Sequence, residues 1–398
     1  MITFVYMEPR HNPYSPGAGT IPPELAGRNE IIERVSIALD RCRNGLAARG
    51  VLLVGLRGVG KTVLLTRMAQ DAEANGFTVV AVETPERRSL PALLIPSLRA
   101  ALLKLNRLAS LEESGKKALR VLGSFIGAMK IKYQDVEFGL DLGQEIGVAD
   151  SGDLEYDLKS LLMEVGRAVQ QQHTALTLFI DEIQYIEEDQ FAALIMALHQ
   201  CAQHQLPVIL IGAGLPQLVA QAGKAKSYAE RLFEYPEIGP LDRLFAKEAL
   251  VSPAGKLGVV YTDDALTEIF SQTQCYPYFL QEWGKHCWDS AARSPVTKSD
   301  VEFATTLAIS DLDASFFRVR FDRLTPLEKK YLRAMATLGP GPQRSGDIAE
   351  VLGKLSHSTA PTRSSLIRKG MIYSQSHGDN YFTVPLFGEF MMRVMPEL

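Results

Sequence analysis

Between Glu24 and Gly239, short and mostly apolar runs alternate with longer stretches in which apolar residues recur at helical spacing. Such runs are typical of strands that are buried on both faces of a sheet. The candidate strands are Val51–Val54, Phe77–Glu83, Leu176–Ile180, Pro207–Gly212 and, more weakly, Phe233–Ile238. Strands that alternate with helices predict the α/β class with a mainly parallel sheet.

After Gly239 the pattern changes twice. From Leu241 to about Phe321 the spacing of apolar residues is helical throughout. From Arg323 onward, short helical segments are followed by an alternating pair of strands. We therefore expect an extended arm over 1–20, an α/β core over 21–240, an all-α part over 241–322 and a C-terminal module over 323–398.

The amino-acid composition is typical of a globular protein. The chain has 398 residues, of which 46% are hydrophobic and 22% charged, as in soluble globular proteins. The formal net charge of −4 means that any contact with nucleic acid must come from a local basic patch. We expect reduced thiols in a cytoplasmic protein, because no C-x-x-C pair occurs. Neither a signal peptide nor a membrane span is expected, because the N-terminus has no long apolar stretch and no run of about 18 apolar residues occurs. The cysteines are Cys42, Cys201, Cys275 and Cys287.

The segment Gly55–Thr62 reads G-L-R-G-V-G-K-T and fits the phosphate-loop pattern G-x-x-x-x-G-K-[ST]. A predicted strand precedes it and a predicted helix follows it, so backbone N–H groups and a helix N-terminus can surround a phosphate. Lys61 is expected on the β- and γ-phosphates, and the Thr62 hydroxyl on Mg²⁺. The alternative is a glycine-rich turn without a ligand. The predicted nucleotide contacts are Gly55, Leu56, Arg57, Gly58, Val59, Gly60, Lys61, Thr62 and Val63.

Two adjacent carboxylates, Asp181 and Glu182, follow the apolar run Leu176–Ile180. Ligands of open α/β sheets bind at the edge where parallel strands end. Asp181 is expected to orient Mg²⁺, and Glu182 to activate the water that attacks the γ-phosphate. The alternative is an acidic pair at the start of a helix.

Together, Gly55–Thr62 and Ile180–Glu182 resemble an AAA+ ATPase. Pro22–Glu30 resembles the short box before the first strand of origin-recognition-like and archaeal-type members, in which Leu25, Ala26, Gly27 and Arg28 would cover the adenine. Cys275–Leu280 resembles the Gly-x-Pro motif of the helical lid, with Pro277 near the nucleotide and Cys275 in place of glycine. The resemblance implies a P-loop AAA+ core with a helical lid over 241–322, with ATP or ADP and Mg²⁺ as cofactors.

Two departures from the resemblance suggest slow hydrolysis. The strand before Gly212-Ala213-Gly214 ends without the polar sensor of many relatives. The helix after Pro277 lacks their arginine, and Gln281 and Lys285 are its nearest polar candidates. Arg231 stands where the resemblance places a finger for a neighbour's γ-phosphate, and the alternative is a helix-end ion pair.

About ninety residues separate Glu83 from Leu176, too many for a plain crossover. Within this insertion, over about 106–153, the alternation of Met129–Leu142 predicts a β-hairpin. Relatives carry DNA-contacting insertions here, but the basic arm (Lys130, Lys132) and the acidic arm (Glu137, Asp141) nearly cancel. We favour a ribbon that packs on the core or on a partner.

Residues Leu324–Met395 resemble a winged helix-turn-helix. Thr325-Pro326-Leu327-Glu328 is a typical helix start, with an apolar face that is expected to include Leu327 and Tyr331. A second helix is expected over Ser345–Leu352 and a third over Thr359–Lys369, with Ala360 and Leu366 facing inward. Ile372–Gln375 and Asn380–Val384 flank a turn at Ser376–Asp379 and predict the wing.

The third helix of such modules enters the major groove of DNA. From Val351 to Lys369 the chain has no Asp or Glu, and its basic residues are Lys354, Arg363, Arg368 and Lys369. We therefore expect an ATP-dependent, duplex-DNA-binding AAA+ ATPase whose nucleotide state controls assembly, as a homo-oligomer or with a partner. The alternative is a nucleotide-switch signalling or defence ATPase whose winged helix docks a protein.

Overall fold

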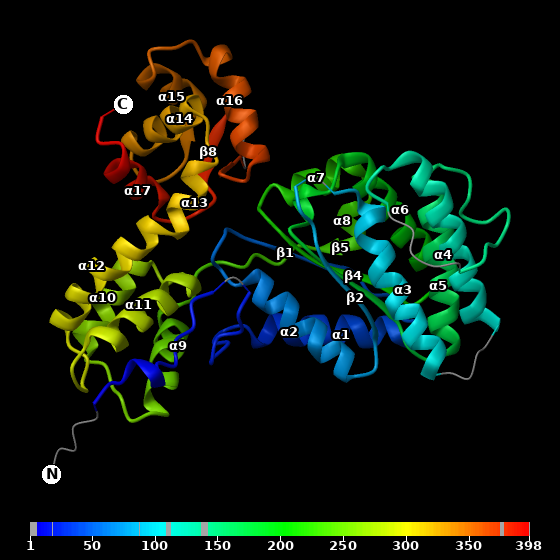
Figure 1. The fold of residues 1–398 in the computed structure, drawn as a ribbon, viewed down its shortest axis with the longest axis horizontal. Coiled ribbons are helices and arrows are strands. Elements are labelled where there is room, and N and C mark those ends of the chain that lie inside the picture. Colours follow the sequence, from blue (N-terminus) through cyan, green and yellow to red (C-terminus); the bar gives the residue numbers. More distant parts are fainter. Residues whose placement is uncertain are drawn as a thin grey trace. The chain divides into compact units, whose positions relative to one another are not determined.

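A computed structural model describes residues 6–17, 19–86, 88–108, 113–136, 142–374 and 378–397. The chain forms two compact units, drawn together in Figure 1. The sheet unit comprises Glu30–Val54 and Lys61–Glu237, and the helical unit comprises Met1–Asn29, Gly55–Gly60 and Ile238–Leu398. The predicted phosphate loop therefore begins in the helical unit and ends in the sheet unit. None of the described helices is long and apolar enough to cross a bilayer.

The sheet unit contains a five-stranded, all-parallel sheet in the order β2-β3-β4-β1-β5. This sheet confirms the predicted α/β class. Every residue of β1, β3 and β4 is buried, which explains their unbroken apolar runs. The last strand is shorter than expected from Phe233–Ile238. The strands are β1 Gly50–Val54, β2 Thr78–Glu83, β3 Leu176–Asp181, β4 Val208–Gly214 and β5 Phe233–Glu234.

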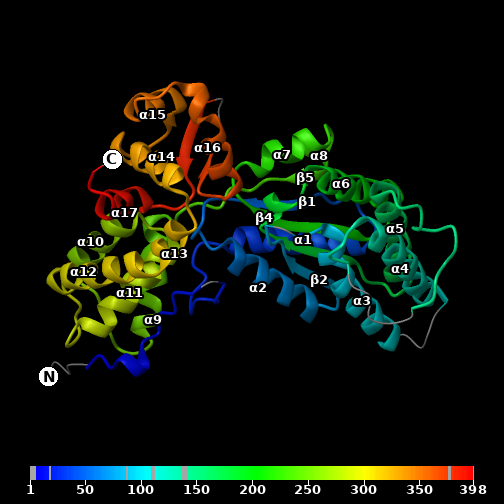
Figure 2. The ribbon, with the colours of Figure 1, turned by 45° about the horizontal axis from the view of Figure 1, so that its top comes forward.

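Helices cover both faces of this sheet, with α1 and α2 on one face and α6 on the other in Figures 1 and 2. A continuous apolar core joins the strands to the helices of the insertion. The helices are α1 Asn29–Arg43, α2 Lys61–Ala74, α3 Leu90–Leu108, α4 Glu113–Lys132, α5 Leu154–Gln171, α6 Glu188–Gln203, α7 Leu218–Ala225 and α8 Ala229–Leu232, with a 3-10 turn η2 at Ile183–Tyr185.

The β-hairpin predicted over Met129–Leu142 is wrong in its first arm. Met129–Lys132, with Lys130 and Lys132, is the last turn of α4. Phe125 and Met129 are fully buried four residues apart, so helical spacing continues to the end of the segment. Ile131, which the alternation placed with Met129, is 92% exposed. The second arm, with Glu137 and Asp141, lies outside the described residues.

The helical unit starts with a short segment that packs against helices far along the chain. The expected extended arm is instead docked, with a 3-10 turn η1 at Pro9–His11 and a buried Tyr14. The Tyr14 hydroxyl donates to Leu250 O at 2.5 Å and lies 2.9 Å from the Tyr261 hydroxyl. The predicted all-α part is present as α9 Arg243–Gly255, α10 Asp263–Thr273, α11 Pro277–Ser290, α12 Lys298–Ala314 and α13 Phe316–Asp322.

The C-terminal part combines helices with a small antiparallel sheet in the order β6-β8-β7. Its first helix begins with the predicted capping box, in which the Thr325 and Glu328 side chains each accept from the other's backbone N–H. Leu327 is 52% exposed rather than part of the apolar face. The elements are α14 Pro326–Thr337, β6 Gln343–Arg344, α15 Ser345–Val351, α16 Ser356–Arg368, β7 Ile372–Tyr373, β8 Asp379–Phe382 and α17 Phe387–Val394.

The third helix of this part differs from its predicted form. It begins at Ser356 rather than Thr359, and Ala360 is exposed instead of facing inward, whereas Leu366 is fully buried. Glu328 ties its end to α14, because its carboxylate accepts from Ser365 Oγ and Lys369 Nζ, both at 2.7 Å. Of the predicted wing turn, Ser376 and His377 lie outside the described residues.

Candidate nucleotide site

Two predicted motifs meet in the sheet unit. Thr62 is the second residue of α2, and Asp181 is the last residue of β3. The Thr62 hydroxyl donates to Asp181 Oδ2 at 2.6 Å, although 119 residues separate the two in sequence. Lys61, the first residue of α2, is only 8% exposed. The lysine, the hydroxyl and the carboxylate thus belong to one site at the end of the sheet.

Asp181 is 6% exposed, and burial raises the pKa of its carboxyl above the usual value. The neighbouring Glu182 charge raises the pKa further, while the Thr62 hydrogen bond and the Lys61 charge oppose both effects. A hydroxyl next to a carboxylate is an oxygen donor set that suits Mg²⁺. No group of three or more His, Cys, Asp or Glu side chains that could hold a metal occurs among the described residues. This is compatible with Mg²⁺, which is usually held by one or two carboxylates plus substrate phosphates.

Glu182 follows β3 in a left-handed conformation, with φ 51° and ψ 39°. Its backbone N–H donates to Asp181 Oδ1 at 2.8 Å, so the Asp181 carboxylate is held against the backbone of Glu182. Non-glycine residues in this region of backbone space are strained and are enriched at functional sites. The conformation turns the chain sharply where the sheet ends.

Gln184 is a site residue that the sequence analysis missed. It lies in η2, is 7% exposed, and its amide donates to Glu182 Oε2. Its other amide atom, Oε1, accepts from Leu215 N at 3.1 Å. A Cβ on Gly214 would lie 2.7 Å from this oxygen, so glycine leaves the room that Gln184 fills. Two features of the sequence could have indicated this role. One is a glutamine within an otherwise apolar, buried segment, and the other is the Gly-Ala-Gly end of β4, which leaves room for its amide.

The glycines of the phosphate loop are structurally required in the helical unit. A Cβ on Gly55 would lie 2.1 Å from Ile238 O, and Gly58 has φ +84°. Gly58 O accepts from Tyr278 N at 3.1 Å, and Arg57 N donates to Thr383 O at 3.0 Å. The first part of the loop is therefore bonded to the start of α11 and to the segment after β8.

The predicted adenine box lies beside α9. A Cβ on Gly27, at φ +67°, would come within 2.6 Å of the Phe245 ring, and Arg28 donates to Gly239 O. Burial lowers the pKa of the Arg28 guanidinium from its usual value, with the Asp242 charge opposing. Ala26 is buried and Leu25 half-buried. The contact of Leu25, Ala26, Gly27 and Arg28 with an adenine base stays a prediction.

In the lid motif, Cys275 stands where the family pattern has glycine. Pro277 is the first residue of α11, and Cys275 before it has φ 58°. Glycine is favoured at such a position because it has no Cβ. Gln274, at φ 50°, is left-handed as well. Cys275 therefore has a backbone conformation that favours glycine.

The five remaining predicted residues differ in their surroundings. Arg231 is exposed near the end of α8, and its role as a finger stays a prediction. Arg363 and Lys369 make internal contacts, and their predicted role in nucleic-acid binding stays a prediction. Arg363 Nε donates to Asn380 Oδ1, and Lys369 Nζ to Glu328 Oε2, both at 2.7 Å. Lys354 and Arg368 are exposed.

One family model matches the part of the chain that carries these motifs. Residues 24–211 match the AAA ATPase domain. The matched segment contains the predicted adenine box, the phosphate loop and the pair Asp181 and Glu182. The match therefore supports nucleotide binding like that of AAA ATPases. Residues 314–391 match a domain of unknown function (DUF8462). No match was found among curated proteins.

Two solved structures are similar to the chain to different degrees. A Walker-type ATPase of Pyrococcus abyssi superposes with a TM-score of 0.59 at 14% identity, covering 94% of this chain and 99% of that one. The Aeropyrum pernix Orc1 protein in complex with DNA matches with a TM-score of 0.46 at 16% identity, covering 94% of each chain. The first likeness shows the fold alone, because its identity is low. Together with the AAA ATPase domain match, it agrees with a P-loop AAA+ architecture.

Proposed function

We propose that the chain binds ATP at Gly55–Thr62 and hydrolyses it slowly. The observation that carries the proposal is the 2.6 Å hydrogen bond from Thr62 to Asp181, which unites the two motifs that ATP chemistry needs. Lys61 binds the β- and γ-phosphates in this proposal, and Thr62 with Asp181 holds Mg²⁺, which would neutralise developing charge on the phosphates. Glu182 takes the proton of the attacking water.

Replacing Glu182 tests this assignment. Glu182→Gln keeps the shape of the side chain but removes the proton acceptor, so ATP turnover is lost while ATP binding remains. Glu187→Gln, an exposed carboxylate nearby in sequence, is the matched control and keeps the wild-type rate. An unchanged rate in Glu182→Gln would show that another group activates the water. A steep rise of rate with protein concentration would support Arg231 as a finger between copies.

We further propose that residues 323–398 form a winged helix that binds duplex DNA through α16. Three helices and the strand pair β7–β8 occur in the expected order, and Lys354 and Arg368 are exposed on either side of a segment without acidic residues. Phosphate contact by exposed lysine and arginine is the electrostatic basis of such binding. Arg363 and Lys369 also make contacts within the protein in this proposal.

Fluorescence anisotropy of the full chain with duplex DNA tests the second proposal. The double variant Lys354→Gln, Arg368→Gln should weaken binding and reduce the slope of log affinity against log salt by up to about two. Lys247→Gln with Lys256→Gln removes the same charge from α9 and should leave affinity unchanged. Absent binding, or equal effects of both doubles, would favour a winged helix that docks protein.

A further inference from the structure

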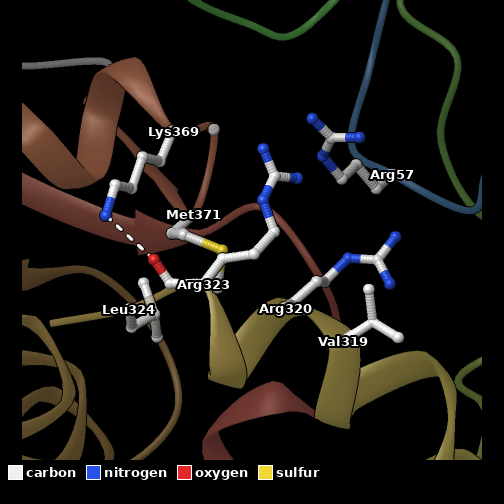
Figure 3. A pocket seen from close by; sticks show the side chains of 8 residues that line it. Arg57, Val319, Arg320, Arg323, Leu324, Lys369 and Met371 are labelled. Carbon is white, nitrogen blue, oxygen red and sulfur yellow. Dashed lines mark hydrogen bonds between the residues drawn. The ribbon is translucent and has the colours of Figure 1, made fainter.

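A pocket of about 160 Å³ in the helical unit gathers positive charge (Figure 3). Arg57 reaches it from the phosphate loop, and Arg320 and Arg323 from α13 and its end. Lys369 reaches it from the end of α16. The figure shows Arg320 and Arg323 extending from α13 toward Arg57, with Lys369 on the far side of Arg323. The lining is completed by Val319, Leu324, Gly370 and Met371.

Two of these side chains are held in place by the protein itself. The Arg320 guanidinium lies 3.9 Å from the centre of the Phe316 ring, and its NH1 donates to Phe316 O at 2.6 Å. Lys369 Nζ donates to Arg323 O at 3.0 Å and to Glu328 Oε2 at 2.7 Å. A guanidinium has five N–H donors and an ammonium three, so each group can keep its protein contact and still donate to an anion. The pocket is therefore partly preorganised.

We propose that this pocket binds a phosphate group, either a phosphate monoester or a phosphodiester. Arginines present planar donor pairs that match the oxygens of phosphate, and the positive groups of Arg57, Arg320, Arg323 and Lys369 that line the pocket attract an anion. Pockets for whole drug-sized ligands usually measure at least about 300 Å³. At about half that volume, this pocket fits a phosphoryl group better than a whole nucleotide.

A phosphate in this pocket would connect the loop to the C-terminal module. Arg57 N already donates to Thr383 O, so the backbone of the loop is tied to the segment after β8. An anion shared by Arg57, Arg323 and Lys369 would add a second tie through side chains. The inference does not depend on ATP hydrolysis at Glu182 or on DNA contacts by α16.

Calorimetric titration of the full chain with inorganic phosphate at constant ionic strength tests the proposal. The background is Lys61→Ala, because it removes the ammonium that the phosphate loop would use. In that background, Arg323→Gln together with Arg320→Gln should weaken phosphate binding by about tenfold or more, since hydrogen bonds to charged groups are lost. Arg318→Gln removes the same kind of charge from α13 outside the pocket and should bind as the background does.

The outcomes show whether the pocket binds phosphate at all and, if it does, whether the phosphate belongs to DNA or to a small molecule. If the pocket variants also lower the affinity for duplex DNA more than Arg318→Gln does, the bound group is a backbone phosphodiester. If they weaken only inorganic phosphate or pyrophosphate, the ligand is a small phosphate. Absence of phosphate binding in the Lys61→Ala chain, or binding that the pocket variants leave unchanged while circular dichroism shows a folded chain, would overturn the proposal.

Discussion

The Glu182 carboxylate is held by its immediate neighbours rather than by the sheet alone. Its backbone N–H is bonded to Asp181, and its side chain accepts from Gln184, which in turn accepts from the N–H after β4. A catalytic carboxylate must be within hydrogen-bonding reach of its water, so orientation at this scale decides the rate. Gln184 is therefore a positioning residue in the proposed hydrolysis.

Removing the Gln184 amide should lower turnover without much effect on binding. We expect Gln184→Ala to reduce kcat by about tenfold with little change in KM, because the phosphate contacts stay intact. Gly214→Ala should act in the same direction, since its Cβ would displace the amide. Gln200→Ala, on the surface of α6, is the control. A KM effect as large as the kcat effect would contradict a positioning role.

The buried Asp181 charge should make the ligand-free chain less stable at neutral pH. Because its pKa is raised in the folded chain, the folded state binds this proton more tightly than the unfolded state does. The resulting stabilisation is present at low pH and is lost as the pH rises through the raised pKa. We expect Asp181→Asn to increase the free energy of unfolding at pH 7 by up to about 1 kcal/mol, with a smaller gain at lower pH.

Urea unfolding at several pH values measures this difference. Asp263→Asn, whose side chain is 94% exposed, is the control and should show no such gain. A destabilised Asp181→Asn chain at pH 7 would mean that the hydrogen bonds of the carboxylate outweigh its desolvation.

At the scale of elements, the junction between α10 and α11 stores backbone strain. Gln274 and Cys275 are consecutive left-handed residues, and Leu241 N donates to Cys275 O at 3.0 Å across the junction. A left-handed residue with a Cβ costs about 1–2 kcal/mol relative to its right-handed form. The hydrogen bond of Cys275 O and the start of α11 at Pro277 offset this cost and stabilise the junction.

Glycine should relieve backbone strain at Gln274 but should destabilise the helix two residues earlier, at Gln272. Gln274 is exposed and caps α10, so Gln274→Gly should stabilise the helical unit by about 0.5–1 kcal/mol. Gln272→Gly, inside α10, should destabilise it by about 1 kcal/mol, because glycine loses more backbone entropy in a helix. Thermal unfolding of both variants checks the predicted difference in sign. Equal destabilisation would show that the left-handed strain at Gln274 is negligible.

At the scale of the whole molecule, the segment around Tyr14 is part of the core of the helical unit. A Cβ on Gly284 would lie within 2.9 Å of the Tyr14 ring, and Trp288 Nε1 donates to Glu8 O at 2.8 Å. Asn12 Nδ2 donates to Asp289 Oδ1 at 2.7 Å. This segment and α11, more than 270 residues apart in sequence, stabilise each other.

Truncating Tyr14 should weaken the helical unit strongly. We expect Tyr14→Ala to lower the free energy of unfolding by about 3–5 kcal/mol, as for other buried aromatic residues, and Tyr14→Phe by about 1 kcal/mol. The fluorescence of Trp283 and Trp288, the only tryptophans of the chain, reports on this unit during urea unfolding. Tyr6→Ala, at an 84% exposed position, is the control. A Tyr14→Ala chain as stable as the control would mean that the segment is only loosely attached.

The sequence predicted what depends on local pattern and on general rules of sheet topology. Gly55–Thr62 and Asp181 follow strands of one parallel sheet, so their meeting could be expected before the structure was known. Gln184 could not, because its role depends on the room left by Gly214 on another strand. The hairpin over Met129–Leu142 failed because alternation over a few residues also fits the end of an amphipathic helix. The docking of Tyr14 depends on partners too distant in sequence to leave a local signal.

The buried position of Tyr14 has a consequence for the order in which the chain folds during synthesis. Its partners Leu250 and Gly284 are made long after it. At about 5–20 residues per second, the ribosome needs on the order of 15–50 seconds to complete them. Throughout that interval the aromatic ring lacks these partners, while the strands of the sheet unit are already being made. The nascent polypeptide can therefore close its helical unit only late in translation.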